Sequence, residues 1–208
     1  MEQIKEMTAK ESLALITETM NNNRKEITRR GGKYFVLWGI LLTFFSLLVY
    51  CLWKTTGHAE WNNLWFALPI IGCPLARWIR AKEGSERTGN TVSRVISGIW
   101  ATFGVFACSS ALFTIIFTKC NPNPIATIAA GVSMTALIVL LFGMAETITG
   151  VALKNWAIKI AGFVTGIGGV ALYYIIGEKG GFEEQMFLFT LSGIVLVATG
   201  LIVRHQNR

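Results

Sequence analysis

The stretch "YFVLWGILLTFFSLLVYCLW", residues 34–53, decides the fold class of this chain. Its only ionisable side chains are two tyrosines and a cysteine. A helix rises about 1.5 Å per residue, so this stretch reaches about 30 Å, which is the thickness of the hydrocarbon core of a bilayer. It therefore predicts a membrane-spanning helix.

Further apolar runs follow along the chain, and the composition agrees with a membrane protein. Of the 208 residues, 52% are hydrophobic and 15% are charged, whereas soluble domains carry about 25% charged residues. Lipid offers no partner for free backbone groups, so each span should be a helix. Strict alternation of apolar and polar residues is absent, which disfavours a β-barrel. The sequence predicts an all-α bundle of six transmembrane helices, with spans at about 34–53, 64–79, 95–117, 125–144, 156–176 and 186–203.

The basic residues predict the orientation of these spans. Of the 19 lysines and arginines, only Lys54, Lys119 and Lys179 fall in the first, third and fifth connections. Cytoplasmic loops are enriched in Lys and Arg, so both termini are expected in the cytoplasm. The net charge of +7 follows from this bias and suits anionic lipid headgroups, so no nucleic acid partner is expected. A cleavage motif for a signal peptide is not evident, and the first span is expected to act as an uncleaved anchor.

Residues 1–33 predict a cytoplasmic amphipathic helix and a basic collar, ahead of a transmembrane domain at 34–208. Thr8 and Glu11 have the spacing of a capping box, which starts a helix. An apolar face then follows at helical spacing, made of Leu13, Ile16, Met20 and Ile27. Two interpretations stay open: a helix resting on the bilayer surface, or a helix that docks a cytoplasmic protein or a second copy through residues 8–27. "RRGGK", residues 29–33, would form the collar, with its glycines as a hinge.

Small residues in helical register indicate close helix packing in several spans. In the third span they form one stripe: Ser97, Ala101, Gly104, Cys108 and Ala111. The candidate helix-packing glycines are Gly104, Gly143, Gly150, Gly162, Gly166 and Gly169. Such residues let two backbones approach closely, and the third and fourth spans are expected to do so. The alternative is that these faces line a narrow pore. Trp100 lies deep in its span and is expected to pack between helices.

The second span is the most irregular. Pro69 and Pro74 each remove a backbone donor, and Gly72 lies between them, so a helix kink is expected there. Broken helices form substrate sites in many transporters, but kinks that serve only packing are commoner.

Ionisable groups deep in the membrane, which mark transport and catalytic sites, are not expected here. The chain has no aspartate, and both histidines, His58 and His205, lie outside the spans. Glu146 and Lys159 are placed near the inner interface, on either side of a cytoplasmic turn within residues 142–156. We expect an interfacial ion pair between them, as a structural fastening of that turn.

The sequence also lacks the residue patterns of known types of enzyme active site. No cluster of His, Cys and Glu has metal-ligand spacing, and no Ser or Cys has a recognisable His partner. We therefore expect no catalytic residue, cofactor or metal. Cys51 and Cys120 are both expected near the outer face, which is compatible with a disulfide, although free thiols are favoured.

Three segments together carry a resemblance to a known group of proteins: "ESLALITETMNNNRKEI" at 11–27, "YFVLWGILLTF" at 34–44 and "FGMAETITGVALKNW" at 142–156. With them the chain resembles a family of small six-span inner-membrane proteins of Gram-negative bacteria. The resemblance implies a location in the bacterial inner membrane and a cytoplasmic helix ahead of six membrane helices. It also implies that some members accompany small transcription regulators, and it brings no catalytic residue.

The sequence leaves two functions open. The first is a non-enzymatic accessory or regulatory membrane protein whose N-terminal helix contacts a cytoplasmic partner. The alternative is a small transporter or channel, whose path runs past the second span and the small-residue faces of the third to fifth spans.

Overall fold

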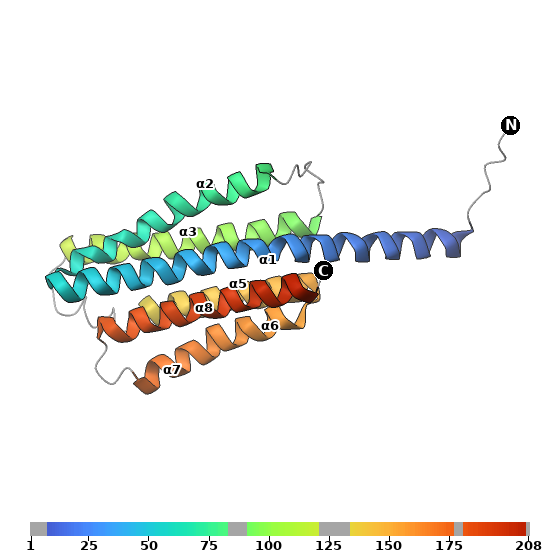
Figure 1. Ribbon diagram of the computed structural model, residues 1–208. Helices are drawn as coiled ribbons and strands as arrows, with labels where there is room; N and C mark the ends of the chain where they lie inside the picture. The colour runs from blue at the N-terminus through green and yellow to red at the C-terminus, as the bar shows by residue number, and fades with distance from the viewer. Residues whose placement is uncertain (1–7, 83–90, 121–133, 177–180, 207–208) are drawn as a thin grey trace.

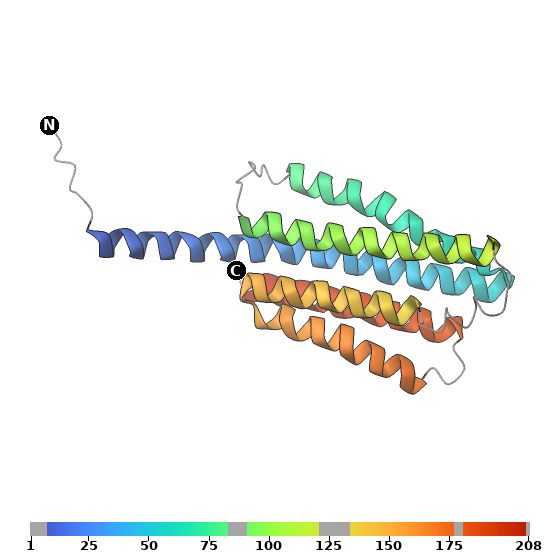
Figure 2. The ribbon, with the colours of Figure 1, turned by 180° about the vertical axis from the view of Figure 1, so that it is seen from behind.

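The computed structural model describes residues 8–82, 91–120, 134–176 and 181–206, and these residues form a bundle of helices (Figures 1 and 2). The elements are α1 (Ala9–Thr56), the 3-10 helix η1 (Ala59–Phe66), α2 (Ala67–Lys82), α3 (Thr91–Cys120), α5 (Met134–Leu153), α6 (Trp156–Phe163), the π-helical turn η2 (Val164–Gly168), α7 (Gly169–Ile176) and α8 (Phe182–Gln206). The all-α prediction is confirmed for the part of the chain described.

Five stretches of helix are long and apolar enough to cross a membrane. They are α1, α3, α5, the continuous run Trp156–Ile176 and α8. The predicted second span corresponds to α2, which has 16 residues and is shorter than a full crossing usually needs. The predicted outer turn at 118–124 falls largely outside the described residues, as does most of the first half of the predicted fourth span.

The first helix begins where the sequence predicts. The Glu11 backbone N–H donates to Thr8 Oγ1 at 3.3 Å, and the Thr8 backbone N–H donates to Glu11 Oε2 at 2.9 Å. This is the capping box. The helix ends at Gly57, whose φ of +72° suits a glycine and whose N–H donates to the Trp53 carbonyl at 2.8 Å.

The predicted hinge at Gly31 and Gly32 is wrong, because α1 passes through both glycines as one helix of 48 residues. Gly32 is buried, and a Cβ on it would lie 2.9 Å from the Gly200 carbonyl oxygen. The glycine therefore serves a contact between α1 and α8. The N-terminal part of α1 extends well beyond the bundle (Figure 1).

The contact between α1 and α8 follows a seven-residue repeat. A Cβ on Gly39 would lie 2.7 Å from the Gly193 carbonyl oxygen, seven residues along from the Gly32–Gly200 contact on each helix. One repeat further, Ser46 Oγ donates to the Met186 carbonyl at 2.6 Å. Backbones of two helices meet this closely only where side chains are small. The two helices are thus antiparallel and in close contact over most of the bundle.

The far end of this pair is closed by larger side chains. Trp53 stacks on Phe182, with ring centroids 4.4 Å apart, and Lys54 Nζ lies 3.1 Å from Glu183 Oε1. The C-terminal end of α8 consequently lies beside the collar of α1, where the N-terminal extension begins (Figure 2).

A second glycine contact joins α5 to the run from α6 to α7. Gly143 packs against Gly166, and a Cβ on Gly162 would lie 2.7 Å from the Gly143 carbonyl oxygen. A Cβ on Gly150 would lie 2.7 Å from Lys159 Cα, and one on Gly169 would lie 2.8 Å from Val139 Cγ1. The packing role predicted for these five glycines is confirmed.

The cytoplasmic turn predicted within residues 142–156 is much shorter than expected. Helix α5 continues to Leu153, so only Lys154 and Asn155 connect it to α6. Lys154 has a φ of +52°, and the Asn155 N–H donates to the Gly150 carbonyl at 2.9 Å. Asn155 Oδ1 then accepts from the Ile158 N–H and caps α6. Glu146 therefore lies inside a helix, seven residues before its end.

The predicted second span begins in the 3-10 helix η1 at residues 64–66 and continues directly into α2. Pro69 lies in the first turn of α2, where a missing N–H has no helical partner to lose, and Pro74 lies inside the helix. Gly72 is buried, and a Cβ on it would lie 2.5 Å from the Trp38 indole. The glycine thus admits a tryptophan of α1.

Replacing Gly39 tests the α1–α8 contact. Gly39→Ala should lower the free energy of unfolding by about 1–3 kcal/mol, because the methyl group has no room against the Gly193 backbone. Gly104→Ala is the matched control, since no atom lies within 4 Å of its Cβ position, and it should be neutral or stabilise by up to about 1 kcal/mol. Unfolding from detergent micelles by SDS measures both. Equal effects of the two substitutions would contradict the account.

Candidate functional site

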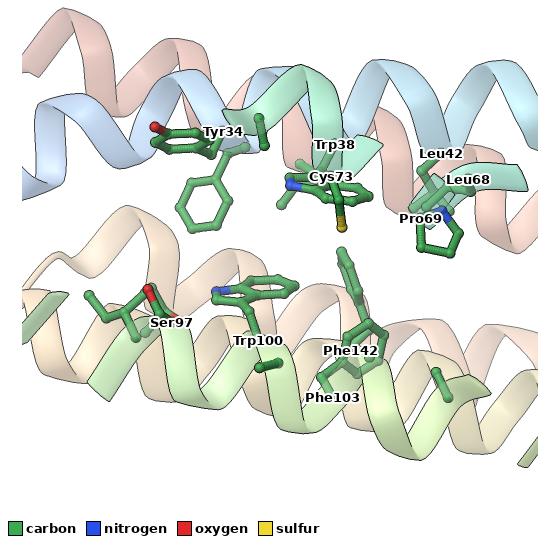
Figure 3. Close-up of a pocket in the computed structure, with 18 of the residues that line it drawn as sticks. Tyr34, Trp38, Leu42, Leu68, Pro69, Cys73, Ser97, Trp100, Phe103 and Phe142 are labelled. Atoms are coloured by element: carbon green, nitrogen blue, oxygen red, sulfur yellow. The ribbon is translucent and has the colours of Figure 1, made fainter. Parts of the chain in front are cut away.

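A cavity of about 1950 Å³ lies among α1, η1, α2, α3, α5 and α8. In Figure 3, Trp38 and Cys73 point into it from one side, and Trp100 and Phe142 point into it from the other. Ligand pockets typically measure about 300–1,000 Å³, so this cavity has room for a long molecule.

Aromatic side chains form the middle of the cavity. Trp100 of α3 lies with its ring 6.1 Å from that of Phe35 and 5.6 Å from that of Phe142, both in edge-to-face geometry. Phe103 lies 5.6 Å from Phe142 in the same manner. Edge-to-face pairs of this kind are favourable and hold ring orientation. Trp100 bridges α1, α3 and α5, so the expectation that it packs between helices is confirmed.

The small-residue stripe of α3 faces this cavity. All five of its residues are lining residues: Ser97, Ala101, Gly104, Cys108 and Ala111. The prediction that Gly104 packs against a neighbouring helix is wrong, because no atom lies within 4 Å of its Cβ position. Helix α3 meets α5 instead through the rings of Trp100, Phe103 and Phe142. The alternative interpretation, in which the stripe lines an open space, describes α3 better.

One end of the cavity is basic. Four arginines from three helices line it: Arg24, Arg30, Arg80 and Arg94. The Arg24 Nε atom is buried and has no hydrogen-bond partner among the described residues. A buried guanidinium nitrogen without a partner is costly, and an anion at this end would satisfy it.

Glu26 is the one acidic lining residue in the described part of the chain. Arg29 donates two hydrogen bonds to its carboxylate, the shorter at 2.8 Å, and Arg30 Nε donates one at 2.7 Å. These hydrogen bonds lower the pKa of the Glu26 carboxyl from 4.5 to about 2, and those from Arg29 have the largest effect. Glu26 is thus ionised at neutral pH and is already engaged by basic side chains.

The opposite end of the cavity is neutral and polar, with lining residues Asn62, Asn63, Trp65 and Gln185. Pro69 and Cys73 of α2 line the stretch between the two ends. The predicted site residues of the second span thus reach the cavity only in part, because Gly72 contacts Trp38 and Pro74 is not among the lining residues.

The expected Glu146–Lys159 ion pair is absent from the structure. Glu146 has no exposed surface, and neither of its carboxylate oxygens has a hydrogen-bond partner among the described residues. The Lys159 ammonium lies 3.4 Å from the centroid of the Trp156 ring instead, in a cation–π contact. The prediction failed because it placed Glu146 at a turn, where a snorkelling lysine would reach it, and not within α5.

Cys51, Cys73 and Cys108 are free thiols, and the side chain of Cys120 lies outside the described residues. No group of three or more His, Cys, Asp or Glu side chains within the described ranges is arranged to hold a metal ion.

Comparisons of the chain with protein-family models, with curated proteins and with solved structures give no match.

The stripe on α3 was predicted from the sequence, but the cavity and the Gly32 and Gly39 contacts of α1 were not. A signal for the contacts was present, since Gly32, Gly39 and Ser46 repeat at seven residues, as do Met186, Gly193 and Gly200. A signal for the cavity was the pair of bulky aromatic residues, Trp100 and Phe103, adjoining the α3 stripe.

The titration of Glu26 tests the basic end. Because its pKa lies below the ordinary value, the Arg–Glu contacts are present above about pH 4.5 and are lost as the pH falls towards 2. The carboxyl carbon signal of Glu26 in an NMR titration should therefore have its midpoint near pH 2. Replacing both Arg29 and Arg30 by Gln should return the midpoint towards 4.5; an unchanged midpoint in that variant would contradict the arrangement.

Proposed function

We propose that the protein is a non-enzymatic membrane protein that binds an anionic amphiphile in the cavity, as a small transporter or carrier. The observation that carries this proposal is the small-residue stripe of α3, which lines a cavity of about 1950 Å³ and whose Gly104 has no atom within 4 Å of its Cβ position. Helices in lipid associate mainly through close packing, so a stripe left open in this way favours a ligand over a partner helix.

The chemistry of the lining supports an apolar chain as the buried part of the ligand. Trp38, Trp100 and Phe142 surround the middle of the cavity (Figure 3), and aromatic side chains bury large apolar areas. The small side chains of α3 leave a long path beside them, which suits an extended hydrocarbon chain.

The charge distribution supports an anionic headgroup at one end. The arginines at that end outnumber the single glutamate, and guanidinium groups bind carboxylate or phosphate in a bidentate manner. The arginines lie on α1, α2 and α3, so a bound headgroup would join three helices. A phospholipid and a free fatty acid share this chemistry.

The proposed placement in the membrane is six crossings with both termini in the cytoplasm of a bacterial cell. The contact of the α8 end with the basic collar of α1 supports termini on one side, and the clustering of basic residues there favours the cytoplasmic side. In this placement η1 and α2 together make the second crossing. The resemblance to six-span inner-membrane proteins leads to the same proposal.

Binding of a long-chain fatty acid, counted by native mass spectrometry in detergent, tests the ligand class. One molecule should bind, and the fatty alcohol of equal length should bind about tenfold more weakly, because it has no negative charge and cannot accept two parallel hydrogen bonds from one guanidinium. Gly104→Phe should lower the affinity at least as much by filling the cavity. Equal binding of acid and alcohol would contradict the headgroup site.

A matched pair of arginines separates the site from general surface charge. Arg94→Gln should weaken binding of the fatty acid severalfold because Arg94 lines the cavity, whereas Arg77→Gln should not, because Arg77 lies on α2 outside the lining. If both substitutions weaken binding equally, the acid is held by the charge of this face and not by the cavity.

A second function is favoured by a separate observation, the projecting part of α1. Leu13, Ile16 and Met20 are 69%, 59% and 58% exposed, on a helix that extends beyond the bundle (Figure 1). An exposed apolar stripe of this kind suits a cytoplasmic protein partner, whose groove would take the three side chains as anchors. The protein would then be an accessory or regulatory membrane protein.

Substitution of the stripe tests this role. The triple change of Leu13, Ile16 and Met20 to Ser should abolish recovery of a co-purified protein or reduce self-association, without loss of membrane insertion. Changing Lys10, Thr17 and Glu18 to Ser, which alters polar residues of the same helix, is the control. Retention of every co-purified protein and of the oligomeric state by the triple variant would contradict docking through this stripe.

A further inference from the structure

Glu146 is a carboxylic acid enclosed in the membrane bundle. Its side chain has no exposed surface, and both carboxylate oxygens are buried without a hydrogen-bond partner among the described residues. It lies seven residues before the end of α5, which is about 10 Å along the helix axis. Ionisable residues inside membrane bundles are costly and usually functional.

The position of Glu146 on α5 is next to the cavity. Val139, Phe142, Thr149 and Leu153 line the cavity, and at 3.6 residues per turn Glu146 falls within the arc of the helix that these four residues span. Gly143 and Gly150, which pack on α6 and η2, lie on the other side of that arc. Glu146 is thus located between the cavity-lining residues and the glycine contact, and it is not itself a lining residue.

Thr165 is the polar neighbour of this carboxyl. It faces Glu146 from η2, but their geometry falls short of a hydrogen bond, and the Thr165 hydroxyl is also buried without a partner among the described residues. The turn that carries Thr165 is π-helical, a conformation that is rare and frequently found at functional sites. Two unsatisfied polar side chains therefore meet at the one π-helical turn in the described residues.

No charged group in the described ranges is bonded to Glu146. The elements packed against α5 are α1, α3, α6, η2, α7 and α8. On α6, the Lys159 ammonium lies over the Trp156 ring. The other titratable residues on these elements nearest the same end of the bundle are Lys33, Tyr34, Arg94, Arg204 and His205. No hydrogen bond joins any of them to the Glu146 oxygens, and the adjoining core is apolar, with Phe35, Leu153, Ile158 and Leu196.

We propose that Glu146, with Thr165, is an intramembrane proton-binding site that exchanges its proton with the cavity. An ionised carboxylate without a partner is very costly in such surroundings, so the neutral acid is the form held in the closed bundle. Its O–H can donate to Thr165 Oγ1 after a small side-chain rotation. When water reaches the site through the cavity, the proton passes to that water as hydronium, and the Thr165 hydroxyl turns to donate to the carboxylate.

This site stands independently of the cavity ligand, because it rests on the burial of Glu146 and not on the basic end. If a fatty acid does not bind, the proton site is unaffected. If both hold, the site supplies a proton-driven step for a carrier.

Infrared spectroscopy of the whole protein in lipid tests the site directly. The spectrum at neutral pH should contain the carbonyl stretch of one protonated carboxylic acid, and Glu146→Gln should remove it. Glu60→Gln, which changes an exposed carboxylate of η1, should leave the band in place. Absence of the band in the native protein, or its survival in Glu146→Gln, overturns the proposal.

Exchange of the proton is tested by the same band in heavy water and at raised pH. The band should shift upon transfer to heavy water within minutes and weaken as the pH rises, and Gly104→Phe should slow the shift at least tenfold by blocking the cavity. Thr165→Val should keep the band and retain more of it at the highest pH, because the carboxylate has lost its donor. Exchange at the same rate in Gly104→Phe overturns the route through the cavity.

Thermal stability separates a proton from a metal cation. In choline chloride the melting temperature of the native protein should fall as the pH rises, because deprotonation leaves a buried unpaired charge, and Glu146→Gln should flatten this dependence. Replacing choline by sodium should make no difference. Restoration of stability by sodium at high pH, only when Glu146 is present, would overturn the assignment to a proton.

Discussion

The bundle depends on direct contact between glycine backbones. Apolar side chains gain nothing by leaving lipid for one another, so membrane helices must be held by close packing and by interhelical hydrogen bonds. Gly32 and Gly39 give α1 this contact with α8, and Gly143 and Gly150 give it to α5 with α6 and η2. A Cβ at any of these positions would meet the backbone of the facing helix or atoms bonded to it. These contacts fix the positions of α1, α5, α6 and α8 relative to their partners in the bundle.

The same constraint explains where the cavity lies. Helix α3 has glycines, but no backbone reaches Gly98 or Gly104, and α2 meets α1 through the large Trp38 side chain. The glycine-paired helices are therefore tightly packed, while α2 meets α1, and α3 meets α5, through aromatic side chains. Glu146 lies between the two kinds of helix contact: the glycine contact of α5 is on one side of it, and the cavity-lining residues are on the other. The close approach of α6 covers the side of Glu146 that faces away from the cavity, and the Lys159 ammonium lies over Trp156 instead of reaching the carboxylate.

Much of the fold could be predicted from local chemistry. The capping box at Thr8 depends on neighbouring residues alone, and the run 156–176 is preceded by Asn155 and followed by Gly177 and Glu178, so both were predicted. Helix α5 was predicted to end too early because Glu146, Thr147 and Thr149 are polar. In the structure Thr149 donates to the Ala145 carbonyl and Gly150 packs on Lys159, so the facing helix decides where α5 ends. The isolation of Glu146 was not predictable for the same reason, because it depends on which glycines contact a facing helix. The cavity had a signal in Trp100 and Phe103 beside the α3 stripe, but only the fold decides whether that stripe contacts a helix.

Amide hydrogen–deuterium exchange of the purified protein tests most directly whether the glycine-paired helices are packed more tightly than α2 and α3. Exchange reports local opening, so α8, α5 and α6 should exchange most slowly, and α2 should exchange fastest among the helices of the bundle. Gly39→Ala should speed exchange in α8 towards the rate of α2 and leave α5 and α6 unchanged. Uniform protection of all membrane helices in the native protein, or no acceleration of α8 in Gly39→Ala, would contradict the account.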